Sequence, residues 1–150
     1  MIEIFILSLI QGITEFLPIS SSSHLILISE FLNFKNQSLS IDVSLHIGSF
    51  MAVVIYFYKD ISNFFYNKVL FFKIFVSSIP VMIIGFLLVK SGLIEKIRNL
   101  ETIAWTTIIF GILLFISDRF KLEKEIKNNF SYKSAIFIGF LQILSLIPGV

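Results

Sequence analysis

The sequence predicts an all-α, polytopic membrane protein with an inverted-repeat fold, and three observations carry this prediction. The 150 residues are 56% hydrophobic and 15% charged, with a mean hydropathy of +0.92. Soluble domains carry about 45–50% apolar and about 25% charged residues. Three apolar runs are close to the length that crosses a bilayer core, and two shorter apolar runs each end at a proline. We therefore expect lipid to surround most of the chain.

The opening stretch, 2–32, is predicted to form a re-entrant hairpin of two half-helices. Its apolar halves are separated by Pro18, which cannot continue a helical hydrogen-bond ladder and disfavours helix in the preceding residue. Each half would be about 20 to 25 Å long as a helix, which is short for a hydrocarbon core of about 30 Å. A single kinked span is the alternative. We favour the hairpin because residues 1–10 carry no Lys or Arg that would have to be translocated.

Three longer apolar runs, 41–58, 69–89 and 102–117, are predicted to be full membrane spans. The basic residues divide unequally between the two ends of these spans. Eight fall at one end, Lys59, Lys68, Lys73, Arg119, Lys121, Lys124, Lys127 and Lys133, and four at the other, Lys35, Lys90, Lys96 and Arg98. Because Lys and Arg accumulate in cytoplasmic loops, the first end is expected to be cytoplasmic and the loop 33–40 external.

The end of the chain repeats the pattern of its beginning. The run 134–147 is predicted to be a half-helix that ends at Pro148 and contains Gln142, much as the first run contains Gln11. On the span count, this second run enters from the opposite side, which is the sequence pattern of an inverted repeat. We expect one transmembrane domain that contains the start of a second re-entrant hairpin. It is expected to be incomplete, because a returning half-helix needs residues beyond Val150.

Composition excludes several classes of function. A net charge of +2, spread over short stretches, does not predict a nucleic-acid partner. The absence of cysteine excludes disulfides, a thiolate nucleophile and a cysteine metal site. The N-terminus lacks the basic region and cleavage site of a signal peptide, so we expect it to be retained.

Gln11 and Glu15 are a candidate metal site. A carboxylate at bilayer depth costs about 2.5 to 3.5 kcal/mol on insertion scales, so Glu15 needs a partner. Gln11 precedes it by four residues and shares its helix face. An amide oxygen and a carboxylate can together hold a hard divalent cation, Mg²⁺ or Ca²⁺, with water completing the shell.

A serine run after Pro18 is a candidate phosphate-binding turn. Its members are Ser20, Ser21, Ser22 and Ser23. If a half-helix starts near Ser20, its first backbone N–H groups are unpaired and its positive dipole end attracts phosphate. The hydroxyl groups add donors. One of them can act as a nucleophile if His24 takes its proton, and a hairpin would return His24 towards Glu15.

Each of these residues also has a structural interpretation. Glu15 alone can be a hydrogen-bond partner, and Ser20 alone can cap a helix; we give these readings at least equal weight. His24 alone would more often be a packed histidine. Asp42 and His46, four residues apart at the external end of a span, can join the site, but we interpret them as helix-end anchors.

Residues 11–25, QGITEFLPISSSSHL, resemble the signature of the undecaprenyl-diphosphate phosphatase family, historically called bacitracin-resistance proteins. The signature combines an E/Q-x-x-x-E motif with a proline-serine turn and a histidine at fixed spacing. Residues 42–49 and 52–54 are similar to the family's next segment, and the later spans match in layout more than in residues. Strong similarity covers about the first third of the chain.

The resemblance implies an inner-membrane enzyme that hydrolyses the C55 isoprenoid diphosphate to the monophosphate, which recycles the carrier for peptidoglycan and other envelope polymers. It implies an interdigitated inverted repeat with an active site open to the external face. Gln11 and Glu15 fall on the metal-associated motif, Ser21 on the proposed nucleophile or phosphate-contacting serine, and His24 on the proposed acid/base. Ser23 replaces the family's usual Gly or Ala.

The family's second signature, proline-glycine-x-serine-arginine-serine, begins at Pro148 and stops at Val150. Its arginine is the family's main phosphate clamp, and no residue of this chain obviously replaces it. We therefore expect little phosphatase activity from these 150 residues alone. The competing hypothesis is a carrier-lipid transporter or binding protein without hydrolysis, because broken helices in inverted repeats are common in transporters. Undecaprenyl diphosphate and membrane lipids are the expected partners, and a homodimer is a candidate assembly.

Overall fold

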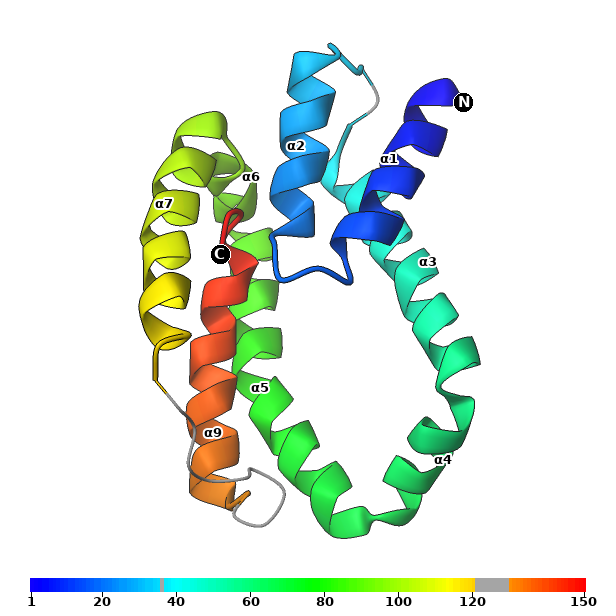
Figure 1. Ribbon diagram of the computed structural model, residues 1–150, viewed down its shortest axis with the longest axis vertical. Coiled ribbons are helices and arrows are strands. Elements are labelled where there is room, and N and C mark those ends of the chain that lie inside the picture. The colour runs from blue at the N-terminus through cyan, green and yellow to red at the C-terminus, as the bar shows by residue number, and fades with distance from the viewer. Residues whose placement is uncertain (36, 121–129) are drawn as a thin grey trace.

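The structure, a computed structural model, describes residues 1–35, 37–120 and 130–150, and this part of the chain is built from helices without strands (Figure 1). Their bounds are α1 Ile2–Thr14, α2 Ser21–Phe31, α3 Leu39–Tyr56, α4 Tyr58–Tyr66, α5 Lys68–Lys90, α6 Leu93–Ile97, α7 Leu100–Ser117, α9 Tyr132–Leu141 and the 3₁₀-helix η1 Gln142–Leu146. The predicted all-α class is confirmed.

Helices α3, α5 and α7 are long and apolar enough to cross a membrane, and they coincide with the three predicted spans. In each of them only 6% of the apolar window is buried inside the chain. Their side chains therefore point outward, which water would penalise and hydrocarbon favours. The predicted polytopic membrane class is confirmed by this composition.

Of the two alternatives for residues 2–32, a hairpin and a single kinked span, the structure has the hairpin. Helices α1 and α2 run antiparallel from one end of the molecule, and the turn between them lies at mid-height (Figure 1). The α-helical ladder ends at Thr14, and the turn is closed by short bonds such as Ile19 N–H to the Leu17 carbonyl, at 2.8 Å. Ser20 is extended, with φ −73° and ψ 104°, and α2 begins directly after it.

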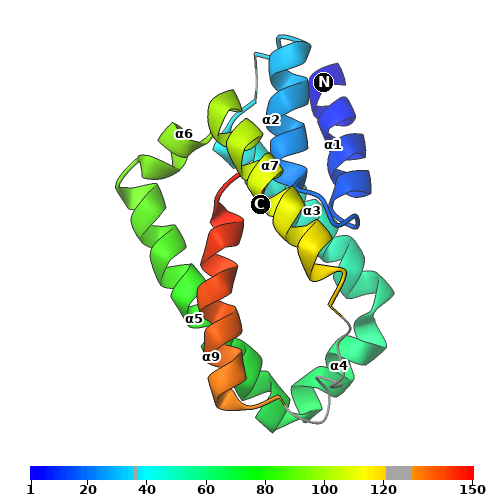
Figure 2. The same cartoon turned by 60° about the vertical axis from the view of Figure 1, so that its left-hand side comes forward.

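The last described segment approaches this turn from the other end. Helix α9 rises beside α5, tightens into η1, and brings the C-terminal turn to mid-height (Figures 1 and 2). There Gly149 has φ +93°, a left-handed conformation that favours glycine. Its N–H donates to Ser20 Oγ at 3.0 Å, and Thr106 Oγ1 on α7 donates to the Pro148 carbonyl at 2.6 Å. Two turns from opposite ends thus meet in the middle of the molecule.

The approach of α9 to α5 depends on small residues. Ala135 is fully buried, and one helical turn later a Cβ on Gly139 would overlap the backbone carbonyl of Ser77. Small side chains let helix backbones come close enough for van der Waals contact, which is the usual basis of helix association in lipid.

Two helices were not predicted. Residues 59–68 lie between two of the predicted spans, and α4 forms there because Ile61, Phe64 and Phe65 recur at helical spacing. Phe64 and Phe65 pack their rings on Phe71 of α5, at centroid distances of 5.7 and 5.5 Å. The other unpredicted helix is the five-residue α6 between α5 and α7.

The predicted distribution of Lys and Arg between the two ends of the spans can be compared with the structure for the described residues. Lys59 lies on α4, and Lys68, Lys73 and Lys133 lie near the starts of α5 and α9, at the α4 end of the molecule (Figure 1); Arg119 follows α7. Lys121, Lys124 and Lys127, and residue 36 of the predicted external loop, lie outside the described residues.

Candidate active site

Glu15 is the centre of a hydrogen-bonded group at the hairpin turn. It is the C-cap of α1, and its Oε2 accepts from Gln11 Nε2 at 2.8 Å and from Ser21 Oγ at 2.7 Å. Gln11 is 1% exposed, whereas the Glu15 side chain is 32% exposed. The hairpin therefore brings the predicted acid and the predicted nucleophile into direct contact, on the accessible side of the turn.

The four serines have different surroundings. Ser23 is buried and its hydroxyl donates to Ser20 Oγ at 3.1 Å, while Ser20 Oγ also accepts from Gly149. Ser20 is thus used to join the two turns and forms no side-chain cap on its own helix. The first N–H groups of α2 are left for an outside acceptor, and Ser21 and Ser22 flank them.

His46 contributes the imidazole that lies against this group. Its Nε2 is 3.5 Å from both Glu15 Oε2 and Ser21 Oγ, and its Nδ1 is 2.8 Å from the Asp42 carbonyl. A carbonyl can only accept, so Nδ1 donates to Asp42, and Nε2 is the ring nitrogen that faces Ser21 and Glu15.

His24 bonds to its own helix, and the expectation that the hairpin returns it towards Glu15 stays a prediction. Its Nδ1 is 2.8 Å from the Ser20 carbonyl one helical turn earlier, and within the described residues it forms no bond to Glu15. The first turn of α2 holds the ring on its own helix. The interpretation of His46 as a helix-end anchor overlooked that α3 packs against α1.

Asp42 and Arg98 form an ion pair that the sequence reading missed. Arg98 Nη2 binds Asp42 Oδ2, with the two side chains 13% and 3% exposed. Gln37 Nε2 donates to the same oxygen at 3.2 Å. A signal was available, because a carboxylate in the first turn of an apolar span needs a partner, as was argued for Glu15. Arg98 was instead counted among the charges of an external connection.

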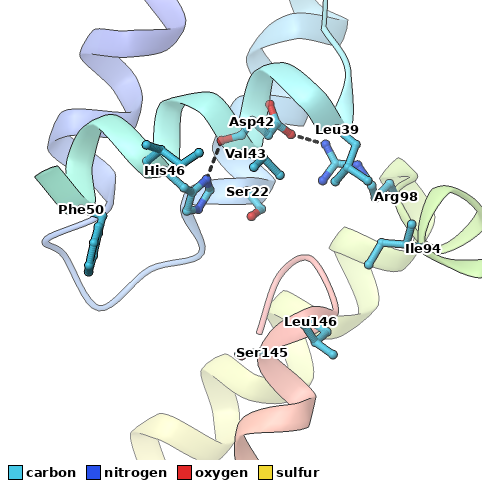
Figure 3. A pocket seen from close by; sticks show the side chains of 11 residues that line it. Ser22, Leu39, Asp42, Val43, His46, Phe50, Ile94, Arg98, Ser145 and Leu146 are labelled. Atoms are coloured by element: carbon cyan, nitrogen blue, oxygen red, sulfur yellow. Dashed lines mark hydrogen bonds and ion pairs between the residues drawn. The ribbon is translucent and has the colours of Figure 1, made fainter. Parts of the chain in front are cut away.

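Asp42, His46 and Arg98 line a pocket of about 420 Å³ between α3, the start of α2, α6 and η1 (Figure 3). Its polar lining is Ser22, Asp42, His46, Arg98 and Ser145, and its apolar lining is Leu39, Val43, Ile47, Phe50, Ile94 and Leu146. A second, apolar pocket of about 360 Å³ is lined by Phe16, Ala52, Val53, Tyr56 and Phe57.

The predicted metal pair can be tested against its donor atoms. Gln11 Oε1 is buried and has no hydrogen-bond partner, and it belongs to a side chain that contacts Glu15. The described part of the chain holds no group of three His, Asp or Glu side chains suited to a metal. This donor set fits a hard cation that keeps several waters or binds substrate phosphates, as Mg²⁺ does.

The comparisons with known proteins show the family of the chain. The family model described as "Bacitracin resistance protein BacA" matches residues 4–150. The chain belongs to the BacA family. The BacA-family chain is 47% identical over 150 residues to an undecaprenyl-diphosphatase of Pelagibacter ubique (strain HTCC1062), with 99% of the chain and 59% of the relative covered.

Two further relatives have the same name. The undecaprenyl-diphosphatase of Alteromonas mediterranea is 43% identical over 160 residues, and that of Jannaschia sp. (strain CCS1) is 36% identical over 159 residues. The matches cover 98% and 97% of the BacA-family chain and 60% of each relative. The chain thus spans about 60% of the length of the curated relatives that it matches.

Proposed function

We propose that the chain takes part in hydrolysing undecaprenyl diphosphate to the monophosphate and inorganic phosphate. The observation that carries this proposal is the contact of Glu15, Ser21 and His46 beside the uncapped start of α2. A carboxylate, a hydroxyl and an imidazole are the groups that nucleophilic displacement uses, and a helix N-terminus attracts phosphate. The names of the relatives support the choice of substrate.

The diphosphate would sit at the first turn of α2. The backbone N–H groups there and the hydroxyl groups of Ser21 and Ser22 can donate to its oxygens, while Ser20 and Ser23 keep the two turns together. The apolar pocket that begins at Phe16, the residue after Glu15, offers a place for the first part of an isoprenoid tail. The polar head would then bind at the first turn of α2 and the apolar tail in the pocket beside Phe16.

In the proposed reaction, Ser21 Oγ forms a bond to the terminal phosphorus as the bond from that phosphorus to the bridging oxygen breaks. The Ser21 hydroxyl, which donates to Glu15 Oε2 before the attack, turns its proton to His46 Nε2, and the electron pair of the broken bond leaves with the lipid monophosphate, which takes up the proton. Water then displaces the Ser21 oxygen from phosphorus, restoring the hydroxyl group and releasing phosphate. Glu15 orients Ser21 through their hydrogen bond. An acid/base role for His24 stays a prediction.

Gln11 and Glu15 would hold a divalent cation, Mg²⁺ or Ca²⁺, together with phosphate oxygens of the substrate. Such a cation supplies positive charge that offsets the charge of two phosphates in a low-dielectric site. We place the chain in the bacterial plasma membrane with this site facing outward, because the basic residues favour a cytoplasmic α4 end.

Phosphate release from farnesyl diphosphate, measured in detergent, tests the proposal. Because the chain spans 59% of the Pelagibacter relative, it is assayed joined to the part of that relative which the alignment leaves unmatched. Glu15→Gln is expected to lower the rate by about 100-fold or more. Glu30→Gln, which removes an exposed carboxylate at the far end of the same hairpin, is expected to leave the rate unchanged.

The same assay separates the two imidazoles. His46→Gln is expected to slow release by about 100-fold, and His24→Gln by much less. The reverse order would assign the Ser21 proton to His24. Transfer of carrier lipid across a vesicle bilayer without phosphate release would contradict hydrolysis and favour the transporter hypothesis.

A further inference from the structure

The side chain of Arg98 has no role in the proposed reaction, but its position is unusual. It follows α6 at the end of the molecule that also carries the N-terminus, where a long basic side chain would ordinarily extend to water (Figure 1). Its side chain is instead only 13% exposed and reaches Asp42, 56 residues away in sequence. Turning a guanidinium inward is costly, so the position calls for a reason.

Arg98 lines the same pocket as Ser22 and His46 (Figure 3). Among the described residues it is the only Lys or Arg that does so. The carboxylates nearby, those of Asp42 and Glu15, would repel a phosphate that carries two negative charges. Arg98 is thus the basic side chain that makes the pocket compatible with an anion.

The bond to Asp42 orients the Arg98 guanidinium and uses only part of its N–H donors. A guanidinium has five N–H donors in a rigid planar fork, and Asp42 accepts from Nη2. The carboxylate of Asp42 is itself held by Gln37. In the described part of the chain no other acceptor binds Arg98, so the rest of the fork is available to oxygens in the pocket. Planar forks of this kind bind phosphate in a bidentate manner.

We propose that Arg98 binds a phosphate group in this pocket and that Asp42 is the positioning residue that holds its guanidinium. The inference rests on the proposed function for the lipid diphosphate. The chemistry that Arg98 recognises is shared by a lipid headgroup and by free phosphate.

Binding to the purified 150-residue chain in detergent tests the proposal. The probes are the methylene analogue of farnesyl diphosphate, in which CH₂ replaces the bridging oxygen, and inorganic phosphate, each measured by calorimetry. Arg98→Gln is expected to weaken binding of the analogue by about 10- to 100-fold, the usual effect of losing a charged hydrogen bond. Lys96→Gln removes the same charge two residues away, outside the pocket, and is expected to change affinity by less than about twofold.

Several outcomes overturn the proposal. Equal affinities of the Arg98→Gln and Lys96→Gln chains, or no saturable binding of the analogue by the unmodified chain, would do so. If Arg98→Gln fails to fold, the Asp42→Asn/Arg98→Gln double variant buries neither charge, and binding of the analogue as tight as in the unmodified chain would refute the role of Arg98. Arg98-dependent binding of inorganic phosphate alone identifies free phosphate as the ligand.

The binding test can reject the phosphate site without rejecting the proposed function, and the hydrolysis test can do the reverse. Arg98-dependent binding of the analogue without any hydrolysis of farnesyl diphosphate would reject the proposed function and retain the phosphate site. Hydrolysis with a KM that Arg98→Gln leaves unchanged would reject the phosphate site and retain the proposed function.

Discussion

The Asp42–Arg98 pair gives the most direct stability prediction. Arg98→Gln leaves Asp42, 2% exposed, with Gln37 as its remaining partner and with Oδ1 already buried without a hydrogen bond. Breaking a buried pair from one side costs about 3 to 5 kcal/mol, because the remaining charge stays desolvated. Asp42→Asn should cost less, about 1 to 3 kcal/mol, since Arg98 is partly exposed and can reach water.

The double variant distinguishes this explanation from simple loss of contact. With neither charge buried, Asp42→Asn/Arg98→Gln should be more stable than Arg98→Gln alone, so the single effects should be non-additive by on the order of 3 kcal/mol. The measurement is reversible unfolding of the purified chain by SDS in mild detergent. The single tryptophan, Trp105 on α7, provides the fluorescence signal.

Lys96→Gln is the matched control, because it removes a basic group from α6 that lies outside the pocket. Its free energy of unfolding should stay within about 0.5 kcal/mol of the unmodified chain. Effects of the two single substitutions at Asp42 and Arg98 that add within about 0.5 kcal/mol would refute the reasoning, since additive sites do not interact.

Two further predictions concern the contacts that assemble the halves of the molecule. Gly139→Ala should destabilise the chain by about 1 to 3 kcal/mol in the same unfolding assay, because its Cβ would overlap the Ser77 carbonyl. Gly111→Ala is the control, since a Cβ there meets open space and should not destabilise the chain. Equal effects of the two substitutions would contradict the close approach of α9. Ser20→Ala should raise the amide hydrogen-exchange rate of Gly149, whose N–H bonds Ser20 Oγ, and an unchanged rate would show that the two turns do not meet there.

The prolines show how far local sequence reasoning reached. Pro18 was predicted to break the first stretch, and the chain does turn there. Pro80 lies inside α5 and the helix continues through it, with Ser77 and Ser78 hydroxyl groups donating to the Ile74 carbonyl nearby. Proline has no N–H to donate in either place. Whether the chain turns depends on the polar residues that follow Pro18 and on what packs against them.

The candidate site also combines a contact within one local turn with a contact that depends on helix packing. Glu15 and Ser21 are six residues apart, and the predicted turn between them brings them into contact. His46 is 25 residues from Ser21, and no local pattern connects them. The choice between His24 and His46 depends on how α3 packs on α1, which neither helix specifies alone.

The sequence by itself determined the solvent, the helical class, the spans and the turn with its serines, because hydrophobicity, helix length and proline chemistry act within one segment. Only the tertiary structure decided which distant residues complete the site. Asp42 and Arg98, 56 residues apart, and Ser20 and Gly149, 129 apart, meet because helices from opposite ends pack side by side. Each of these pairs depends on the packing of several helices, so a scan along one segment does not detect it.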